Sequence, residues 1–296
     1  MATVGTPAIE ENGLVDESQR YRTPYPACPL CGSPGFTVFA AASCKNHPAW
    51  HAPLPESLTW LLCDSCKHIF TDSFYTEAGL TELFRKAHPS QLAGGDLDRQ
   101  RMLWAPVIQM VLQALPDRSR LLNGNWLSWL DVGCGAGGLV FTADEFGFTA
   151  TGIDLREEAV RRIRELGYHA QQADLLSVQC KTPLNVISMA DLLEHTPYPV
   201  AILRHARQLL DANGVLYLSC PNRDCSSWRQ MDIGNSNPYW GEMEHYHNFS
   251  RRSLMGLLRD CGFLPAAYSV SNRYIACMEI VAVKASPAIQ AFPEIL

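Results

Sequence analysis

The chain has 296 residues, of which 47% are apolar, and a formal net charge of −6. This length suits one large domain or a domain with an accessory module, and the composition can supply a full hydrophobic core. The acidic balance excludes the broad basic surface that most nucleic-acid-binding proteins carry. We therefore expect a small molecule, and not a nucleic acid, as the partner.

The first twenty residues hold four acidic side chains and no apolar segment, which argues against a secretory signal. No run approaches the roughly 18 apolar residues of a membrane span. We therefore expect a cytoplasmic protein without membrane contact, as a monomer or a homodimer. In that reducing compartment, the 11 cysteines are expected to be metal ligands or buried apolar residues more often than disulfides.

Residues 1–22 are polar, acidic and aperiodic, and a disordered tail is expected there. The following segment, 23–74, contains two Cys-x2-Cys pairs, which together match the ligand set of a tetrahedral zinc site. The four cysteines are Cys28, Cys31, Cys63 and Cys66. We predict a zinc-ribbon-like module with structural Zn²⁺; the alternative is a group of buried cysteines without metal. A closed shell of four thiolates leaves no open position for chemistry.

The 31 residues between the two cysteine pairs exceed the usual ribbon spacing of about 15 to 20. This insert holds Cys44, His47 and His51. A histidine there could replace a cysteine ligand or reach an active site. Because four cysteines already complete a zinc shell, we favour a solvated loop with incidental histidines.

Segment 75–122 shows apolar residues at helical spacing, interrupted by Gly94 and Gly95. It predicts two helices, which either close over a cofactor pocket as a lid or pack as a linker against the main sheet. From 123 to 285, strand and helix patterns alternate, which predicts a mostly parallel sheet covered by helices. The last 11 residues, 286–296, are expected to form a tail.

The expected strands of this domain are 127–132, 149–154, 169–173, 184–190, 214–220, 265–271 and 274–284. The helices between them begin near Gly138, Glu157 and Pro199, and a further helix covers 251–260. Only two residues separate the last two strands, so these must pair antiparallel. The prediction is a Rossmann-like α/β fold with a seven-stranded sheet that ends in an antiparallel hairpin.

A glycine-rich turn follows the first strand of this domain. Gly133, Gly135 and Gly138 satisfy the dinucleotide-binding fingerprint, and Asp154 lies 21 residues after Gly133, at the end of the next strand. The turn therefore suits either NAD or S-adenosylmethionine. Such a turn also occurs without any ligand, so its surroundings must decide.

Three features favour S-adenosylmethionine. Asp131 precedes the first glycine, where a carboxylate attracts an ammonium group but repels a pyrophosphate. Gly137 adds a glycine that the dinucleotide motif does not require. The sheet ends in a hairpin and not in a second mononucleotide-binding half.

At these residues the chain resembles the class I S-adenosylmethionine-dependent methyltransferases. The matching segments are Leu130-Asp131-Val132-Gly133-Cys134-Gly135-Ala136-Gly137, Gly152-Ile153-Asp154, Ala173-Asp174-Leu175 and Met189-Ala190-Asp191-Leu192-Leu193-Glu194-His195. The run Glu244-His245-Tyr246-His247-Asn248-Phe249-Ser250 is similar to a motif of the small-molecule branch. The resemblance implies that a set of nine residues binds the cofactor: Asp131, Gly133, Gly135, Gly137, Asp154, Leu155, Asp174, Leu175 and Ala190.

Histidine is the natural general base for an acceptor that must lose a proton, because its pKa lies near working pH. His195 follows the fourth strand and faces the crevice where α/β sheets bind ligands. His245 and His247 lie in the long segment after the fifth strand, where they could face the same side. We expect catalytic roles for all three, with His245 first; the alternative for each is a hydrogen bond that orients a loop.

The segment 221–250 is rich in aromatic residues, which is unusual for a loop of about thirty residues. It predicts a substrate wall or lid, with packing against the zinc module as the alternative or as an additional role. The expected substrate-binding residues are Tyr239, Trp240 and Tyr246.

These features predict a small-molecule methyltransferase, with O-, N- or C-acceptor undecided. Members of the branch with a similar N-terminal cysteine module methylate deoxysugars; a sugar is one candidate, although this chain ends soon after the hairpin and lacks their extra domain. An RNA methyltransferase that uses the zinc module for binding, and a non-catalytic interaction protein on the same fold, are the alternatives. The acidic charge argues against the first, and the intact glycine turn and Asp154 argue against the second.

Overall fold

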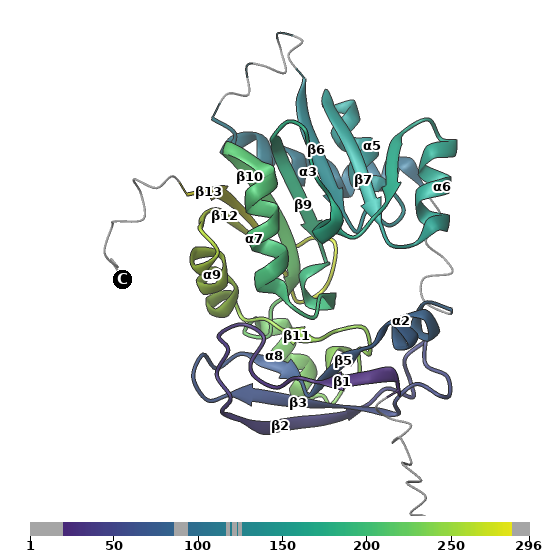
Figure 1. Ribbon diagram of the computed structural model, residues 1–296, viewed down its shortest axis with the longest axis vertical. Coiled ribbons are helices and arrows are strands. Elements are labelled where there is room, and N and C mark those ends of the chain that lie inside the picture. The colour runs from purple at the N-terminus through teal and green to yellow at the C-terminus, as the bar shows by residue number, and fades with distance from the viewer. Residues whose placement is uncertain (1–19, 86–93, 117–118, 120–122, 124–125, 286–296) are drawn as a thin grey trace, which may run out of the picture.

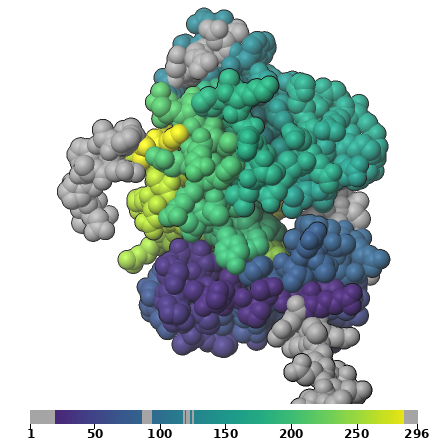
Figure 2. Space-filling view, in the orientation of Figure 1, coloured from purple at the N-terminus to yellow at the C-terminus, as the bar shows by residue number. Residues whose placement is uncertain are grey.

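The computed structural model describes residues 20–85, 94–116, 119, 123 and 126–285. Two layers are visible in Figure 1: an α/β domain built around one large sheet, and a smaller β-rich module that carries the N-terminal part of the chain. The space-filling view shows the two in direct contact, without a gap on this face (Figure 2). In the described part of the chain, no helix combines the length and the apolar character that crossing a bilayer requires.

The main sheet has seven strands in the order β12-β13-β10-β9-β6-β7-β8. Strands β6 to β10 run parallel, and β13 is antiparallel to both β10 and β12. This confirms the predicted fold. The strands are β6 (Leu127–Val132), β7 (Phe148–Asp154), β8 (His169–Gln172), β9 (Leu184–Ala190), β10 (Leu210–Pro221), β12 (Phe263–Val270) and β13 (Cys277–Lys284).

Two strand starts differ from the prediction by three or more residues. Strand β10 begins at Leu210, because Leu210 already pairs with Leu184 before an irregularity that ends at Val215. Strand β13 begins at Cys277, so the hairpin connection is longer than the two residues expected. The longer connection matters because it carries Arg273 back toward the sheet.

Helices cover both faces of the sheet. Successive side chains along a strand point to opposite faces, so they pack into two separate hydrophobic cores. In β6, Leu130 enters the core beneath α7 and α9, whereas Trp129 enters the core beneath α3 and α5. The helices are α3 (Leu97–Ala114), α5 (Gly138–Glu145), α6 (Glu157–Glu165), α7 (Pro199–Leu209), α8 (Ser226–Ile233) and α9 (Arg251–Asp260), with single turns η1 (Leu175–Ser177), η2 (Leu193–His195) and η3 (Pro238–Trp240).

The N-terminal module contains β1 (Arg22–Pro24), β2 (Phe36–Ser43), β3 (Ser57–Cys63), β4 (Ile69–Thr71) and β5 (Ser73–Tyr75), followed by α2 (Glu77–Phe84). Its four-stranded sheet has the order β11-β4-β3-β2. Strand β11 (His247–Asn248) belongs to the long segment after β10, so the α/β domain supplies the outer strand of the module's sheet. The module and the domain are therefore joined through a shared sheet.

The expected tails, 1–22 and 286–296, lie outside the described residues, apart from residues 20–22, where Arg22 begins β1. In the expected helical segment 75–122, the structure describes α2 and α3. Helix α3 buries Val107, Ile108 and Val111 in the core that also contains Val140 of α5. Packing against the main sheet is thus observed for this helix.

Candidate active site

The glycine turn joins β6 to α5 at the carboxyl edge of the parallel strands. Gly133, Gly135 and Gly137 have φ values of +70°, +51° and +80°. A Cβ on Gly133 would lie 2.8 Å from Leu192 Cδ1, and one on Gly137 would lie 2.6 Å from Phe141 Cζ. Backbone strain and lack of space therefore both select glycine here.

Asp154 ends β7 beside this turn and is buried. Its Oδ2 accepts from the Gly135 N–H at 2.9 Å, and its Oδ1 accepts from the Arg156 N–H at 2.9 Å and from Arg156 Nε at 3.0 Å. Burial by itself would raise the pKa of Asp154, but the Arg156 guanidinium and the two N–H groups hold it below its usual value. The carboxylate therefore stays ionised and able to accept hydrogen bonds.

Asp131 lies deeper in the sheet. Its Oδ1 accepts from Ser188 Oγ at 2.6 Å, and Ser188 Oγ accepts in turn from Trp129 Nε1 at 2.8 Å. Burial raises the pKa of Asp131 to about 7, and the nearby Asp154 carboxylate adds to the shift. A cation bound next to Asp131 would favour its ionised form.

The remaining predicted cofactor residues follow the same edge of the sheet. Asp174 caps η1 by accepting from the Leu176 N–H at 3.0 Å, and its side chain is exposed. Leu175 is buried, Leu155 is exposed, and Ala190 is the last residue of β9. Their place at the carboxyl ends of adjacent strands fits the predicted crevice; their contacts with a cofactor stay a prediction.

Helix α3 lies over the start of α5. A Cβ on Gly138 would overlap Gln100 Oε1 and would lie 2.7 Å from Trp104 Nε1. The helix that packs on the sheet therefore also covers the glycine turn. Packing is thus observed for α3, and its closure over a bound cofactor as a lid stays a prediction.

Arg273 is a buried residue of this edge that sequence reasoning missed. Its side chain is 4% exposed and donates to Asp191 Oδ2 at 2.9 Å, to Ser219 Oγ at 2.7 Å and to Glu279 Oε1 at 3.2 Å. Its guanidinium lies 4.2 Å from the centre of the Trp104 ring. No local pattern in the sequence signals that Arg273 binds these acids, because only the folded hairpin brings this arginine to the end of β9.

Two of the three predicted catalytic histidines meet at this edge. His195 ends η2, and its ring centre lies 4.6 Å from that of His245 at an interplanar angle of 85°. His195 Nδ1 lies 3.1 Å from the Glu244 carbonyl oxygen. Burial and the neighbouring His195 keep the pKa of His245 well below its usual value, so the His245 imidazole is neutral.

Glu194 is next to this pair and was not among the predicted residues. It is 1% exposed, and burial together with the nearby Asp191 raises the pKa of its carboxyl well above the usual value. One ligand atom each of Glu194, His195 and His245 lie within 4.8 Å of one another. A buried acid that directly precedes a predicted histidine could have been selected from the sequence.

His247 has different surroundings. Its Nδ1 lies 3.1 Å from His68 Nε2, and its Nε2 lies 2.9 Å from the Thr196 carbonyl oxygen. Both ring nitrogens are therefore engaged at the junction between the module and the domain. This arrangement favours the alternative, a histidine that holds a loop; its catalytic role stays a prediction.

The aromatic segment, residues 221–250, also contacts both the histidine pair and the N-terminal module. Tyr239 stacks on Trp228 with ring centres 4.9 Å apart, and its ring centre lies 6.1 Å from that of His245. Trp240 and Tyr246 instead pack among apolar residues of the N-terminal module. Of the predicted substrate-binding residues, Tyr239 is thus the one whose ring lies near the His245 ring, and the other two show the packing against the module that was the alternative. The binding of substrate by all three stays a prediction.

The four predicted zinc ligands lie together. Cys28 Sγ is 3.7 Å from Cys66 Sγ, and Cys31 Sγ is 3.6 Å from Cys63 Sγ. A tetrahedron with Zn–S bonds of about 2.3 Å requires S···S distances of about 3.8 Å. The donor set and its spacing therefore fit Zn²⁺.

The histidines of the insert are not solvated, contrary to expectation. His47 Nε2 lies 2.6 Å from Glu242 Oε1, and His51 Nε2 lies 2.9 Å from Glu82 Oε1, all four side chains being mostly covered. The expectation was wrong because the insert folds against α2 and the aromatic segment, and the sequence does not show those contacts.

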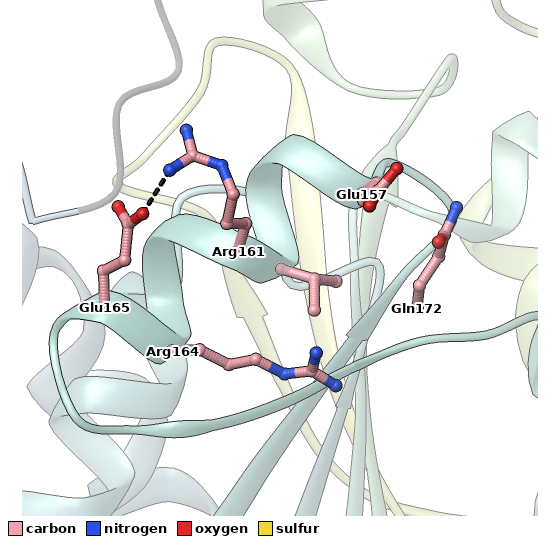
Figure 3. Close-up of a pocket in the computed structure, with 6 residues that line it drawn as sticks. Glu157, Arg161, Arg164, Glu165 and Gln172 are labelled. Carbon is pink, nitrogen blue, oxygen red and sulfur yellow. Dashed lines mark hydrogen bonds and ion pairs between the residues drawn. The ribbon is translucent and has the colours of Figure 1, made fainter.

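A surface hollow on α6 lies apart from these residues. It is lined by Glu157, Arg161, Arg164, Glu165 and Gln172, and Arg161 pairs with Glu165 (Figure 3). It contains none of the predicted site residues. We assign it no role.

Comparison with known proteins identifies the family of the α/β domain. Residues 98–265, more than half of the chain, match the model of a family described as "Methyltransferase domain". A ubiquinone biosynthesis O-methyltransferase of Idiomarina loihiensis is 32% identical over 107 residues, which cover 33% of this chain and 44% of that protein. The chain spans about half the length of the curated relatives it matches.

Among solved structures, the PH0226 protein of Pyrococcus horikoshii superimposes with a TM-score of 0.51 at 15% identity, over 69% of this chain and 98% of that one. A SAM-dependent methyltransferase of Methanosarcina mazei has a TM-score of 0.47 at 21% identity, over 61% and 97% of the two chains. The family match, together with the strand order of the main sheet, gives the assignment. The chain belongs to the methyltransferase-domain family and has the class I fold of S-adenosylmethionine-dependent methyltransferases.

Proposed function

We propose that the protein transfers a methyl group from S-adenosylmethionine to a hydroxyl group of a small molecule. The observation that carries this proposal is the glycine turn with ionised Asp154 beside it. Asp154 would accept from the ribose hydroxyls, and Asp131 would face the ammonium group of the donor. Backbone at Gly133, Gly135 and Gly137 would approach the methionine and ribose portions closely, because no side chain intervenes.

The remaining cofactor contacts follow from the same edge. Asp174 and Leu175 would hold the adenine, with Leu155 and Ala190 lining the pocket on either side. We propose the cytoplasm as the compartment, and a monomer or homodimer as the active form. The cysteine group of the module would hold structural Zn²⁺, because its four sulfur atoms are spaced for a tetrahedron.

Methyl transfer is a displacement in which the acceptor oxygen forms a C–O bond while the C–S bond of the sulfonium breaks, which leaves a neutral thioether. Most of the acceleration must come from holding donor and acceptor in line. A hydroxyl acceptor must also lose its proton. His195 and His245 are the groups that would activate it, with Tyr239 as the wall of the acceptor pocket.

The hydroxyl acceptor is inferred from the relatives that are named ubiquinone biosynthesis O-methyltransferases. Their match covers only part of either chain, so it supports the acceptor group, and the side chains of the site support the class of molecule that carries it. A small phenol, catechol or sugar hydroxyl would suit a site lined by His195, the neutral imidazole of His245 and the Tyr239 ring.

Calorimetry tests the donor site, with S-adenosylmethionine, S-adenosylhomocysteine and NAD as ligands. We expect binding of the first two at one site per chain and no binding of NAD. Formation of S-adenosylhomocysteine is then measured with panels of phenols, catechols, sugars and short RNAs. Methylation of RNA alone, or binding of NAD in place of the sulfonium donor, would contradict the proposal.

A further inference from the structure

Glu194, His195 and His245 form a compact group of two imidazoles and one carboxylate. Each offers one ligand atom, and these atoms lie within 4.8 Å of one another. Metal ligands at bond lengths of about 2.0–2.2 Å are separated by roughly 3 to 4.4 Å. Small side-chain rotations, which shorten these separations by up to about 1–2 Å, would therefore let the three side chains share one ion.

Two atoms of the group are buried without a hydrogen-bond partner among the described residues: Glu194 Oε2 and His245 Nδ1. Their residues are 1% and 6% exposed, so water does not readily satisfy them. A buried carboxylate oxygen and a buried imidazole nitrogen are costly unless something binds them. A cation satisfies both at once.

The third ligand is oriented as metal-binding histidines usually are. His195 Nδ1 lies 3.1 Å from the Glu244 carbonyl oxygen, and only a protonated Nδ1 can donate to a carbonyl. This contact assigns the proton to Nδ1 and leaves the lone pair on Nε2. Ligating histidines commonly donate their other ring N–H to a carbonyl in this way.

The backbone holds the group together across two distant segments. The Tyr246 N–H donates to the Glu194 carbonyl oxygen at 2.8 Å, which fixes the segment that carries His245 against η2. That segment continues into β11, which pairs with β4 of the N-terminal module. Backbone hydrogen bonds therefore hold the segments that carry the ligands next to each other.

We propose that Glu194, His195 and His245 bind one divalent first-row transition metal ion, such as Mn²⁺, Fe²⁺ or Zn²⁺. Two imidazoles with one carboxylate suit these ions better than Mg²⁺ or Ca²⁺, which prefer all-oxygen ligands. Three protein ligands leave coordination positions open. This site differs from the cysteine group, whose four thiolates form a closed shell.

A consequence follows that rests on the proposed function. An acceptor hydroxyl in an open position would bind the ion through oxygen and lose its proton to water, because a bound cation lowers the pKa of its oxygen ligands. His195 and His245 would then act as ligands and not as proton acceptors. The resulting alkoxide or phenoxide would attack the methyl group directly.

Cobalt provides the test, because its visible spectrum distinguishes thiolate ligands from nitrogen and oxygen ligands. Full-length protein carrying its cysteine-bound zinc is titrated with Co²⁺, in the wild type and in Glu194→Gln, His195→Asn and His245→Gln variants. His169→Gln, an exposed histidine on β8, is the matched control. Circular dichroism checks that each variant folds. If one variant fails to fold, the other two still test the site.

We expect one additional Co²⁺ per chain, with the weak bands of nitrogen and oxygen ligation, and an affinity at least about tenfold lower in each variant but unchanged in His169→Gln. Absence of such bands at millimolar Co²⁺, or equal affinity in the wild type and the variants, would overturn the proposal. Greater thermal stability of Glu194→Gln with no metal response in the wild type would also overturn it, and would indicate an acid–imidazole pair.

The outcome is separable from that of the proposed function. S-adenosylmethionine binding is measured on the same samples, and neither Asp154 nor the glycine turn belongs to the metal group. Cobalt binding without donor binding would leave the metal site standing and remove the methyltransferase proposal. Donor binding without cobalt binding would remove the metal site and leave the methyltransferase proposal standing.

Discussion

Replacement of Asp154 is the sharpest test of the donor site. The buried carboxylate has both oxygens placed at the turn, one on the Gly135 N–H at 2.9 Å and the other on the Arg156 N–H at 2.9 Å. Asp154→Ala removes the charged acceptor for the ribose hydroxyls and also releases the turn. A hydrogen bond to a charged group contributes about 1.5–3 kcal/mol, so we expect the Kd of S-adenosylmethionine to rise about 10- to 150-fold.

Asp154→Asn separates the two effects, because its amide oxygen can still accept from the Gly135 N–H while the charge is lost. We expect a smaller rise in Kd for this variant than for Asp154→Ala. Glu158→Gln, which removes the same charge from an exposed position on α6, is the control. Calorimetry at constant pH gives the three affinities. A change of less than about twofold in Asp154→Ala would refute the ribose assignment.

Three further predictions concern stability and metal content. The folded-state pKa of Asp131 is raised to about 7, so ionisation of its carboxyl opposes folding, and the contribution of Asp131 to stability falls as pH rises from about 4 to 7. The Tm of Asp131→Asn relative to the wild type should therefore increase with pH, and a Tm difference that is independent of pH would contradict this. Purified protein should contain about one Zn²⁺ per chain by metal analysis, and replacing both Cys28 and Cys63 by Ser should remove it and lower the Tm; full zinc content in that variant would exclude the cysteine site. Arg273→Ala should lower the free energy of unfolding in urea by about 3–5 kcal/mol, because Asp191 and Glu279 lose a buried partner, whereas a loss below 1 kcal/mol would mean that these acids are otherwise satisfied.

The strand and helix order of the main domain was predictable, because apolar alternation and glycine punctuation are local signals. The turn of Gly133 and Gly137 was identified from its spacing, and its positive φ values show why glycine is required there. Asp131 was selected because its carboxylate directly precedes the first glycine, and Asp154 because it ends the next strand, 21 residues after Gly133. Local pattern and the geometry of parallel sheets were enough for these residues.

Strand boundaries were less predictable where pairing decides them. Leu210 belongs to β10 because it pairs with Leu184, and β13 begins at Cys277 because Cys277 pairs with Pro221 of β10. The prediction of a solvated insert was wrong because contacts with distant segments determine its surroundings. His47 contacts a carboxylate of the aromatic segment and His51 contacts a carboxylate of α2, and both partners lie far away in the sequence.

The sequence by itself determined the class of the fold, the position of the glycine turn and the four cysteines of the module, because each is encoded by neighbouring residues at fixed spacing. Tertiary structure alone decided which distant side chains meet. It brought Arg273 to Asp191, placed His247 in a strand shared with the module, and set His245 beside Glu194 and His195. These contacts depend on how separate segments pack and pair, and no local pattern in the chain specifies that.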